Sequence, residues 1–167
     1  MILIYHPPRG PSRHRVAVWR RLKTLGALYL QDGVAALPQD AVTREQLEWL
    51  QLRIREAGGE ATLWEALPNT VAENRDLVEA FRDAREEGYG RVIEGAERIR
   101  REVELGGDGA LLSEELARTE REFRAERRRD YFRSPLRTEA AEALRAARRA
   151  LVEGADSVGR EQAARDV

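Results

Sequence analysis

The sequence contains no cysteine, only two histidines and few aromatic residues among its 167 positions. Without cysteine the chain can form no disulfide, offers no thiolate nucleophile and cannot ligate zinc or an iron–sulfur cluster through sulfur. His6 and His14 are too few for a histidine-rich metal site. We therefore expect neither a metal nor a cofactor.

The chain also lacks a long apolar segment. No run approaches the roughly 18 residues that a membrane-spanning helix needs. The apolar stretch that begins at Met1 is much shorter than the apolar core of a signal peptide. The expectation is a cytoplasmic protein that makes no contact with a membrane.

Charged residues are abundant, at 35% of the sequence, yet the formal net charge is only −1. A net charge near zero gives no overall attraction to nucleic acid or membrane. The two signs are nevertheless segregated, because residues 1–66 carry nine basic and seven acidic groups whereas residues 67–167 carry 20 and 23. Residues 1–26 hold six Arg or Lys and no acid. An anion-binding face is expected in this first part.

Residues 1–38 predict a strand, a helix and a hairpin. Met1–Tyr5 is a continuous apolar run, which is typical of a strand buried on both faces. A helix is expected from about Ser12 to Leu25, and Gly26 is placed to end it. Asp32-Gly33 between two apolar runs is a strong hairpin signal.

A second helix and a fourth strand follow the hairpin. Thr43 and Gln46 have the spacing of a capping box, which predicts a helix over 44–57, and residues 61–64 predict a short strand. Strand, helix, hairpin, helix and strand is the order of a ferredoxin-like βαββαβ module with an antiparallel sheet. The expected fold class is α+β, with this module at residues 1–66.

Residues 67–153 predict a helical extension packed on the module, and residues 154–167 predict a frayed tail because they have little to bury. A capping box at Thr70 and Glu73 marks the start of the first helix of the extension. About three helices are expected, at residues 71–105, 113–132 and 134–153.

The predicted helix at 12–25 carries the candidate binding residues. Val18, Leu22 and Leu25 mark its buried stripe, so most of its cations point elsewhere. Such cations could line a phosphate backbone or hold an oxyanion at the amino end of the helix. A solvated helix face in an arginine-rich protein has the same pattern. The candidates for DNA or anion binding are Arg9, Arg13, Arg15, Arg20, Arg21 and Lys23.

Arg15 differs from the other cations because its spacing to the core leucines places it with the buried stripe. A charge there needs a partner or a solvent-filled cleft. It therefore either contacts an anion or forms an ion pair with Asp32 or Glu65. Trp49 and Leu52 lie off the buried stripe of the second helix, so either the C-terminal helices cover them or they form a partner-binding site.

Residue patterns of enzymes are missing from the sequence. No glycine-rich loop follows a strand in the order that cradles phosphate. No serine or threonine has a histidine partner at a turn typical of nucleophiles. Acidic pairs lie on charged helices, where surface pairing at i,i+4 explains them. We therefore expect a protein that is not an enzyme.

Four strings of the sequence resemble the amino-terminal domain of the chromate-resistance regulator ChrB. The first two are LIYHPPRGPSRHRVAVWRRLKTLGALYLQDGVAALP at residues 3–38 and EQLEWLQLRIREAGGEATLWEA at residues 45–66. AFRDAREEGY at 80–89 and RRRDYFRSP at 127–135 are similar to the helical part of the same domain. The resemblance implies transcriptional control of chromate efflux, with DNA as partner and the cations of the 12–25 helix as phosphate contacts.

Two other functions fit the residues without this role. A protein-interaction or oligomerisation module agrees with the near-zero net charge and the acidic C-terminal helices. An oxyanion-binding protein, with chromate or another oxyanion as ligand, agrees with the cations near the amino end of the 12–25 helix.

Residues 3–38 are also similar, more weakly, to the ferredoxin-like endonucleases of CRISPR spacer acquisition and to a domain of phenylacetate-pathway repressors. These endonucleases bind metal through an aspartate at the end of the first strand, where this sequence has His6. The difference argues against a metal-dependent nuclease. Domains of this kind commonly pair through their sheets, so the resemblance implies a homodimer.

Overall fold

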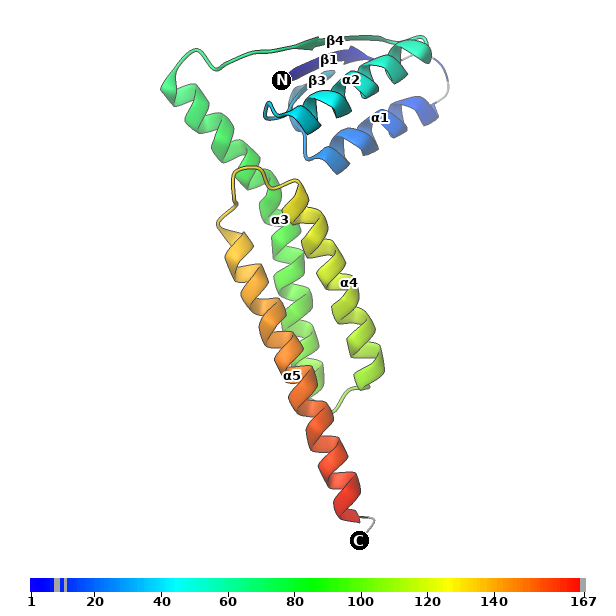
Figure 1. Ribbon diagram of the computed structural model, residues 1–167, viewed down its shortest axis with the longest axis vertical. Coiled ribbons are helices and arrows are strands. Elements are labelled where there is room, and N and C mark those ends of the chain that lie inside the picture. The colour runs from blue at the N-terminus through cyan, green and yellow to red at the C-terminus, as the bar shows by residue number, and fades with distance from the viewer. Residues whose placement is uncertain (8–9, 11, 166–167) are drawn as a thin grey trace. The chain divides into compact units, whose positions relative to one another are not determined.

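The computed structural model describes residues 1–7, 10 and 12–165, with side chains described up to residue 156. This part of the chain contains a four-stranded antiparallel sheet and five helices (Figure 1). It divides into two compact units, Met1–Phe81 and Arg82–Val167. The predicted mixed α/β composition, with an antiparallel sheet first and mostly helix afterwards, is confirmed. None of the described helices is long and apolar enough to cross a membrane.

The first unit contains the sheet and two helices on the same side of it (Figure 1). The strands lie in the order β2-β3-β1-β4, and every neighbouring pair is antiparallel. The elements are β1 Ile2–His6, α1 Ser12–Leu25, β2 Leu28–Gln31, β3 Val34–Ala36, α2 Ala41–Glu56 and β4 Glu60–Trp64.

The core of this unit lies between one face of the sheet and the two helices. Leu3 of β1 is paired with Ala35 of β3 and with Leu63 of β4, and directly paired residues share a face of the sheet. Leu3 has no solvent-accessible surface, and neither has Leu22 of α1 or Leu47 of α2. These leucines join the sheet and both helices in one apolar layer.

The opposite face of the sheet is open within the first unit. Ile4 of β1 is 38% exposed, and Trp64 of β4, on the same face, is 57% exposed. The prediction that β1 is buried on both faces is therefore wrong. Both helices lie on one side, and an antiparallel sheet can leave its other side to solvent.

The predicted end of α1 is confirmed. The Ala27 N–H donates to the Leu22 carbonyl at 3.0 Å, and the Gly26 N–H donates to the Lys23 carbonyl at 3.1 Å. This pair of hydrogen bonds is the Schellman motif, which stops a helix and satisfies its last carbonyls. The chain thus leaves α1 directly into β2.

The predicted hairpin turn at Asp32-Gly33 is also confirmed. Gly33 has φ of 73°, which is a left-handed conformation that glycine adopts without strain. The Tyr5 N–H donates to the Gly33 carbonyl at 2.7 Å, and a Cβ at position 33 would lie 2.5 Å from the Tyr5 carbonyl oxygen. Glycine is therefore required where the hairpin contacts the end of β1.

Helix α2 begins at Ala41, before the predicted start, because its N-cap is Asp40. The Asp40 carboxylate accepts a hydrogen bond from the Thr43 N–H at 2.7 Å, and the Thr43 hydroxyl accepts one from the Asp40 N–H at 3.0 Å. Thr43 is thus the third helical residue of the capping box. The predicted box between Thr43 and Gln46 is wrong.

Three helices follow β4, and the core of the second unit lies between them. The capping box that opens the first of them is confirmed, since Thr70 and Glu73 exchange backbone-to-side-chain hydrogen bonds of 2.9 and 3.1 Å. The core residues are Tyr89, Val92, Ala96, Ile99, Leu116, Ala140, Leu144 and Ala147. The helices are α3 Val71–Glu104, α4 Gly109–Arg128 and α5 Leu136–Arg165.

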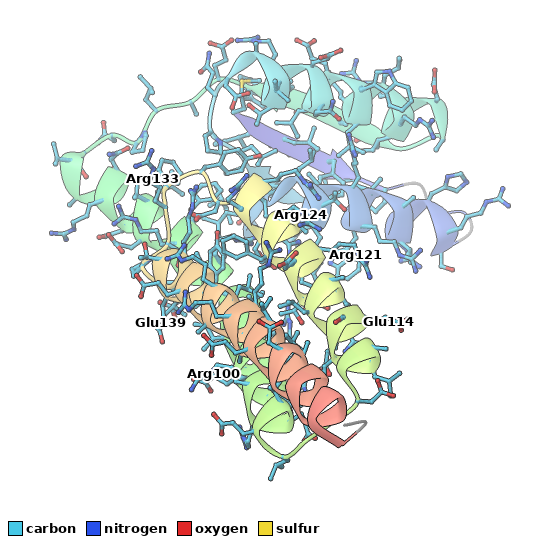
Figure 2. All side chains as sticks on the ribbon, turned by 60° about the horizontal axis from the view of Figure 1, so that its bottom comes forward. Arg100, Glu114, Arg121, Arg124, Arg133 and Glu139 are labelled. Atoms are coloured by element: carbon cyan, nitrogen blue, oxygen red, sulfur yellow. The ribbon has the colours of Figure 1, made fainter. Side chains whose placement is uncertain are left out.

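The outer surface of these helices is charged. Arg100 of α3, Glu114 of α4 and Glu139 of α5 point away from the core (Figure 2). This is the pattern expected of helices that bury one stripe each and leave the rest to solvent.

The bounds of α4 and α5 differ from the predicted ones. Helix α4 begins at Gly109 because the Asp108 carboxylate accepts from the Ala110 N–H at 2.8 Å and so caps the helix. The predicted start at Ser113 is wrong for this reason. Helix α5 continues to Arg165, beyond the end expected near Glu153.

Candidate functional site

Helix α1 buries one stripe and exposes its cations. Val18 and Leu22 are its buried residues, while Arg13, Arg15 and Arg20 are all exposed. The helix contains no acidic residue that could neutralise them at i,i+3 or i,i+4. Three exposed cations, Arg13, Arg20 and Lys23, lie within about 80° of one another around the helix axis, and we call them the basic face.

Arg15 is exposed as well, contrary to the predicted inward orientation. It lies about 160° from Arg13 around the helix axis, on the side of the buried stripe, but it precedes Val18, the first buried residue of α1, by three positions. Its predicted partner Glu65 is bound instead by Arg44 and, at 3.1 Å, by the Gln39 amide. The hydrogen bond from Arg44 lowers the pKa of the Glu65 carboxyl. Among the described residues Arg15 forms no ion pair, so the predicted pair with Asp32 or Glu65 is wrong.

Two cations of the basic face contact neighbouring rings. Arg13 donates to the ring nitrogen of the neighbouring His14 at 3.4 Å. The Lys23 ammonium lies 5.0 Å from the centroid of the Trp19 ring, a cation–π contact. Arg9, the remaining predicted contact, lies outside the described residues.

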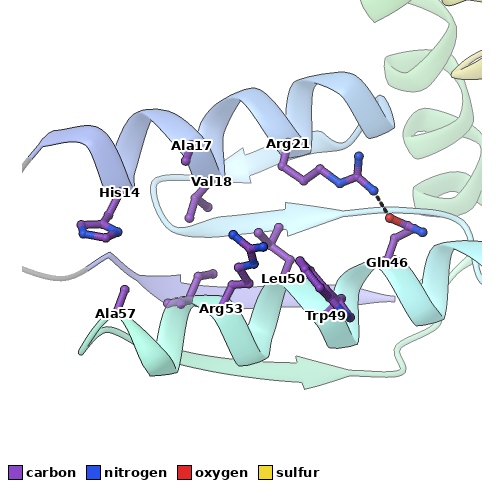
Figure 3. A pocket seen from close by; sticks show the side chains of 10 residues that line it. His14, Ala17, Val18, Arg21, Gln46, Trp49, Leu50, Arg53 and Ala57 are labelled. Atoms are coloured by element: carbon purple, nitrogen blue, oxygen red, sulfur yellow. Dashed lines mark hydrogen bonds between the residues drawn. The ribbon is translucent and has the colours of Figure 1, made fainter.

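A groove of about 460 Å³ lies between α1 and α2 (Figure 3). Its floor is apolar, because it is formed by Val18 of α1 and by Leu50 and Ile54 of α2, all of them buried. Ala17 and Ala57 line it as well, and their small side chains leave the space open.

Arginine side chains from both helices border the groove. Arg21 of α1 donates to the Gln46 side-chain oxygen of α2 across one end (Figure 3). The Arg53 guanidinium carbon lies 4.4 Å from the centroid of the Trp49 ring. Arg21 was predicted to contact phosphate with Arg20, but successive residues point about 100° apart on a helix. Arg21 therefore lies on the groove side of α1 and Arg20 on the outer side.

The predicted partner-binding residues lie together beside this groove. A second hollow of about 440 Å³ is lined by Trp49 and Leu52 of α2, with Glu56 at its edge. Trp49 is 57% exposed and Leu52 is 53% exposed. Both side chains are thus available on the helix side of the first unit.

Three residues of this region, His14, Ala17 and Arg53, are not among the predicted site residues. The spacing of these residues in the sequence does indicate which of them share a helix face. Ala17 follows His14 by three residues and Arg53 follows Trp49 by four, so each pair shares one helix face. What the spacing could not show is that the two faces border a common groove.

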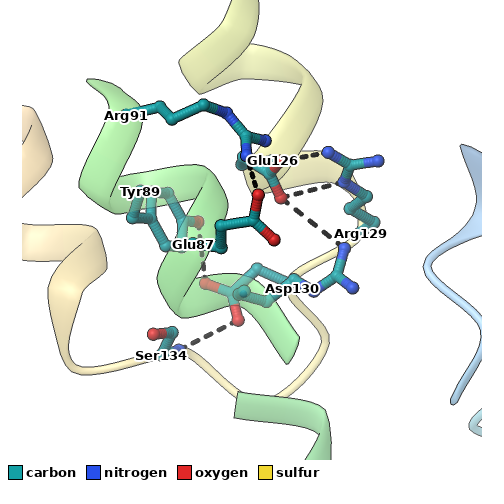
Figure 4. Close-up of polar contacts among 8 residues, drawn as sticks. Glu87, Tyr89, Arg91, Glu126, Arg129, Asp130 and Ser134 are labelled. Carbon is teal, nitrogen blue, oxygen red and sulfur yellow. Dashed lines mark hydrogen bonds and ion pairs between the residues drawn. The ribbon is translucent and has the colours of Figure 1, made fainter. Parts of the chain in front are cut away.

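A separate polar cluster is buried in the second unit (Figure 4). The Glu126 side chain is 5% exposed, accepts from the Arg129 Nε at 2.9 Å and lies 3.5 Å from the Arg85 guanidinium. The Arg85 side chain is 11% exposed, and burial lowers the pKa of its guanidinium. Because each buried charge has a partner of opposite sign, the cluster is compatible with a stable core.

Asp130 extends this cluster to the loop before α5. Its carboxylate accepts from the Tyr89 hydroxyl and from the Ser134 N–H, both at 2.9 Å (Figure 4). Burial, followed by this hydrogen bond, raises the pKa of the Tyr89 hydroxyl. The strings at 80–89 and 127–135 supply these residues, so their shared role is to join α3, α4 and the following loop.

The described structure is thus a small mixed α/β unit with an exposed basic helix, followed by a three-helix unit. The family model described as "Protein ChrB, N-terminal" matches residues 15–165, nearly the whole chain. The chain belongs to this family, and the resemblance found in the sequence is confirmed. Neither a curated protein nor a solved structure matches the chain.

Gly88 and Gly90 of α3 test the position of the buried cluster. A Cβ at Gly88 would overlap the Glu126 side chain, whereas a Cβ at Gly90 would meet nothing within 4 Å. We expect Gly90→Ala to stabilise the protein by up to about 1 kcal/mol, the helix-propensity difference. Gly88→Ala should destabilise it by about 1–3 kcal/mol, as overpacking does.

Urea unfolding of the two variants, followed by far-UV circular dichroism, measures both effects. The two substitutions add the same methyl group to the same helix, so each controls for the other. Equal effects on the free energy of unfolding would contradict the placement of Glu126 against Gly88.

Proposed function

We propose that this chain is a transcription-regulator domain of the chromate-resistance type, that it is not an enzyme, and that it binds DNA through the basic face of α1. The observation that carries the proposal is the exposure of Arg13 and Arg20, on one face of a helix without acidic residues. Membership of the ChrB N-terminal family supports the regulatory role. A regulator that contacts DNA would act in the cytoplasm.

The spacing of the cations fits contact with a phosphate backbone. Arg13 and Arg20 are seven residues apart, or about 10 Å along the helix axis, so they can meet different phosphates of one duplex. Charge-assisted hydrogen bonds from guanidinium to phosphate are among the stronger polar contacts in proteins. Such contacts position a protein on DNA without reading its sequence, so the proposal concerns affinity and orientation.

We also propose that the first unit is ferredoxin-like and that the protein forms a homodimer through its sheet. The element order βαββαβ and the strand order β2-β3-β1-β4 support the fold assignment. The open sheet face, with Ile4 and Trp64 exposed, supports the dimer, because exposed apolar patches commonly mark interaction surfaces. In such a dimer the two copies of α1 would lie on opposite outer sides, because α1 covers the other face of the sheet (Figure 1).

Neutralising the basic face should abolish most DNA binding. We expect Arg13→Gln/Arg20→Gln to weaken binding of a fluorescent duplex by more than about tenfold at low salt, because two charge-assisted contacts are lost. Fluorescence anisotropy measures the change. The control is Arg127→Gln/Arg128→Gln, which removes two exposed charges from α4 and should leave affinity unchanged. Equal losses in both double variants would contradict a site on α1.

Sedimentation velocity tests the dimer and its surface. The wild-type protein should sediment at twice the chain mass of 19.0 kDa, and Trp64→Lys should sediment at 19.0 kDa because it places a charge on the sheet face. Trp49→Lys is the matched control, since Trp49 on the helix side is also 57% exposed. If Trp49→Lys dissociates the dimer and Trp64→Lys does not, the chains associate through the helix side. A monomeric wild-type protein would contradict the proposed dimer.

A further inference from the structure

We propose that the groove between α1 and α2 is a docking site for an acidic amphipathic helix of another protein. The two hollows described above share His14, Trp49, Arg53 and Ala57, so they form one continuous groove. Along α2 its lining extends from Gln46 to Ala57, which is about 16 Å of helix. A groove of this length fits an elongated occupant, and three turns of helix match it.

The floor of the groove selects an apolar helix face. Val18 and Leu50 are each 6% exposed and Ile54 is 1% exposed, so these side chains belong to the core, and they also line the groove. Ala17 and Ala57 leave space beside them. A partner helix with apolar residues at i, i+3, i+4 and i+7 would extend the core by a third helix, which is a common mode of peptide recognition.

The rim of the groove selects acidic flanking residues. Arg21 is hydrogen-bonded to the neutral Gln46, and Arg53 lies over the Trp49 ring. In the described part of the chain neither arginine forms an ion pair, whereas arginines of α3 and α5 pair with glutamates. Glu56, at one edge, is the acidic member of the lining. The surplus of positive charge is complementary to glutamate or aspartate on a partner.

This site is distinct from the basic face. Ala17 and Arg21 of α1 line the groove (Figure 3). Arg13 and Arg20 are exposed and do not belong to its lining. A DNA backbone has no apolar surface to place against Val18, so the groove and the basic face suit different partners. Docking in the groove therefore does not depend on DNA binding.

Tryptophan fluorescence offers a direct test with the full chain. The protein has three tryptophans, and Trp19 and Trp64 are exposed outside the groove. The variant Trp19→Phe/Trp64→Phe leaves Trp49 as the single reporter. The probe is a synthetic helix of about 14 residues, four turns, with leucines on one face and glutamates beside them. We expect a saturable blue shift of Trp49 emission, with a Kd below about 1 mM.

Paired variants and peptides decide the outcome. Ala17→Phe fills the groove and should weaken binding at least about tenfold, while Val16→Phe, one position away and 40% exposed, should not. Arg53→Glu should weaken binding similarly, and Arg20→Glu should not. A peptide of the same composition with its leucines scattered around the helix should bind at least about tenfold more weakly.

Three results would overturn the proposal. They are the absence of a saturable shift, equal affinity for the ordered and the scattered peptide, and equal effects of Ala17→Phe and Val16→Phe. Circular dichroism confirms that each variant keeps its helices. Titration of Ala17→Phe with duplex DNA should show wild-type affinity, so the groove and the basic face are assayed separately.

Discussion

The structure of the first unit depends on the burial of one apolar stripe of α1 against the sheet. Leu22 of α1 and Leu3 of β1 have no solvent-accessible surface, and burying a leucine stabilises a fold by about 1.5–3 kcal/mol. Burying an unpaired guanidinium group costs free energy instead of stabilising the fold. The stripe therefore fixes the rotation of α1, and this rotation places Arg13 and Arg20 outward and Arg21 beside the groove.

The two units use their many charges in different ways. In the second unit Glu126 and Asp130 are buried and satisfied by Arg129, Tyr89 and the Ser134 N–H, so these charges join helices to one another. On α1, Arg13 and Arg21 donate to neutral side chains, and Lys23 contacts the Trp19 ring. A chain with a net charge of only −1 thus has a local positive surface, which is what steering of an anionic partner requires.

The sequence predicted α1 and the hairpin well because several local signals agree there. The leucine spacing and the stop at Gly26 agree on the extent of α1. The turn at Asp32-Gly33 separates β2 from β3. The predicted starts of α2 and α4 are too late, because Asp40 and Asp108 are the N-caps. A threonine or serine a few residues further on, Thr43 or Ser113, gives the same sequence signal. An apolar run such as Met1–Tyr5 shows that a strand exists, but it does not show on which side the helices lie.

The candidate site was predictable in part. Exposure of Arg13 and Arg20 follows from the position of the buried stripe. Arg15 lies on the side of that stripe, and its exposure depends on where along α1 burial begins, which is at Val18. The groove could not be predicted, because it depends on the separation of α1 and α2, and this separation is set by the sheet beneath them. Ala17 and Ala57 acquire a role only once the two helices are placed.

The central claim is that the basic face of α1 binds DNA through phosphate contacts, and the salt dependence of binding tests it most directly. The affinity of the full chain for a duplex should fall linearly on a double-logarithmic plot against salt, with a slope near −0.9 for each phosphate contacted. Arg13, Arg20 and Lys23 on each chain predict a slope of about −3 or beyond. Undetectable binding at about 50 mM salt, where phosphate contacts are strong, or an affinity independent of salt would contradict the account.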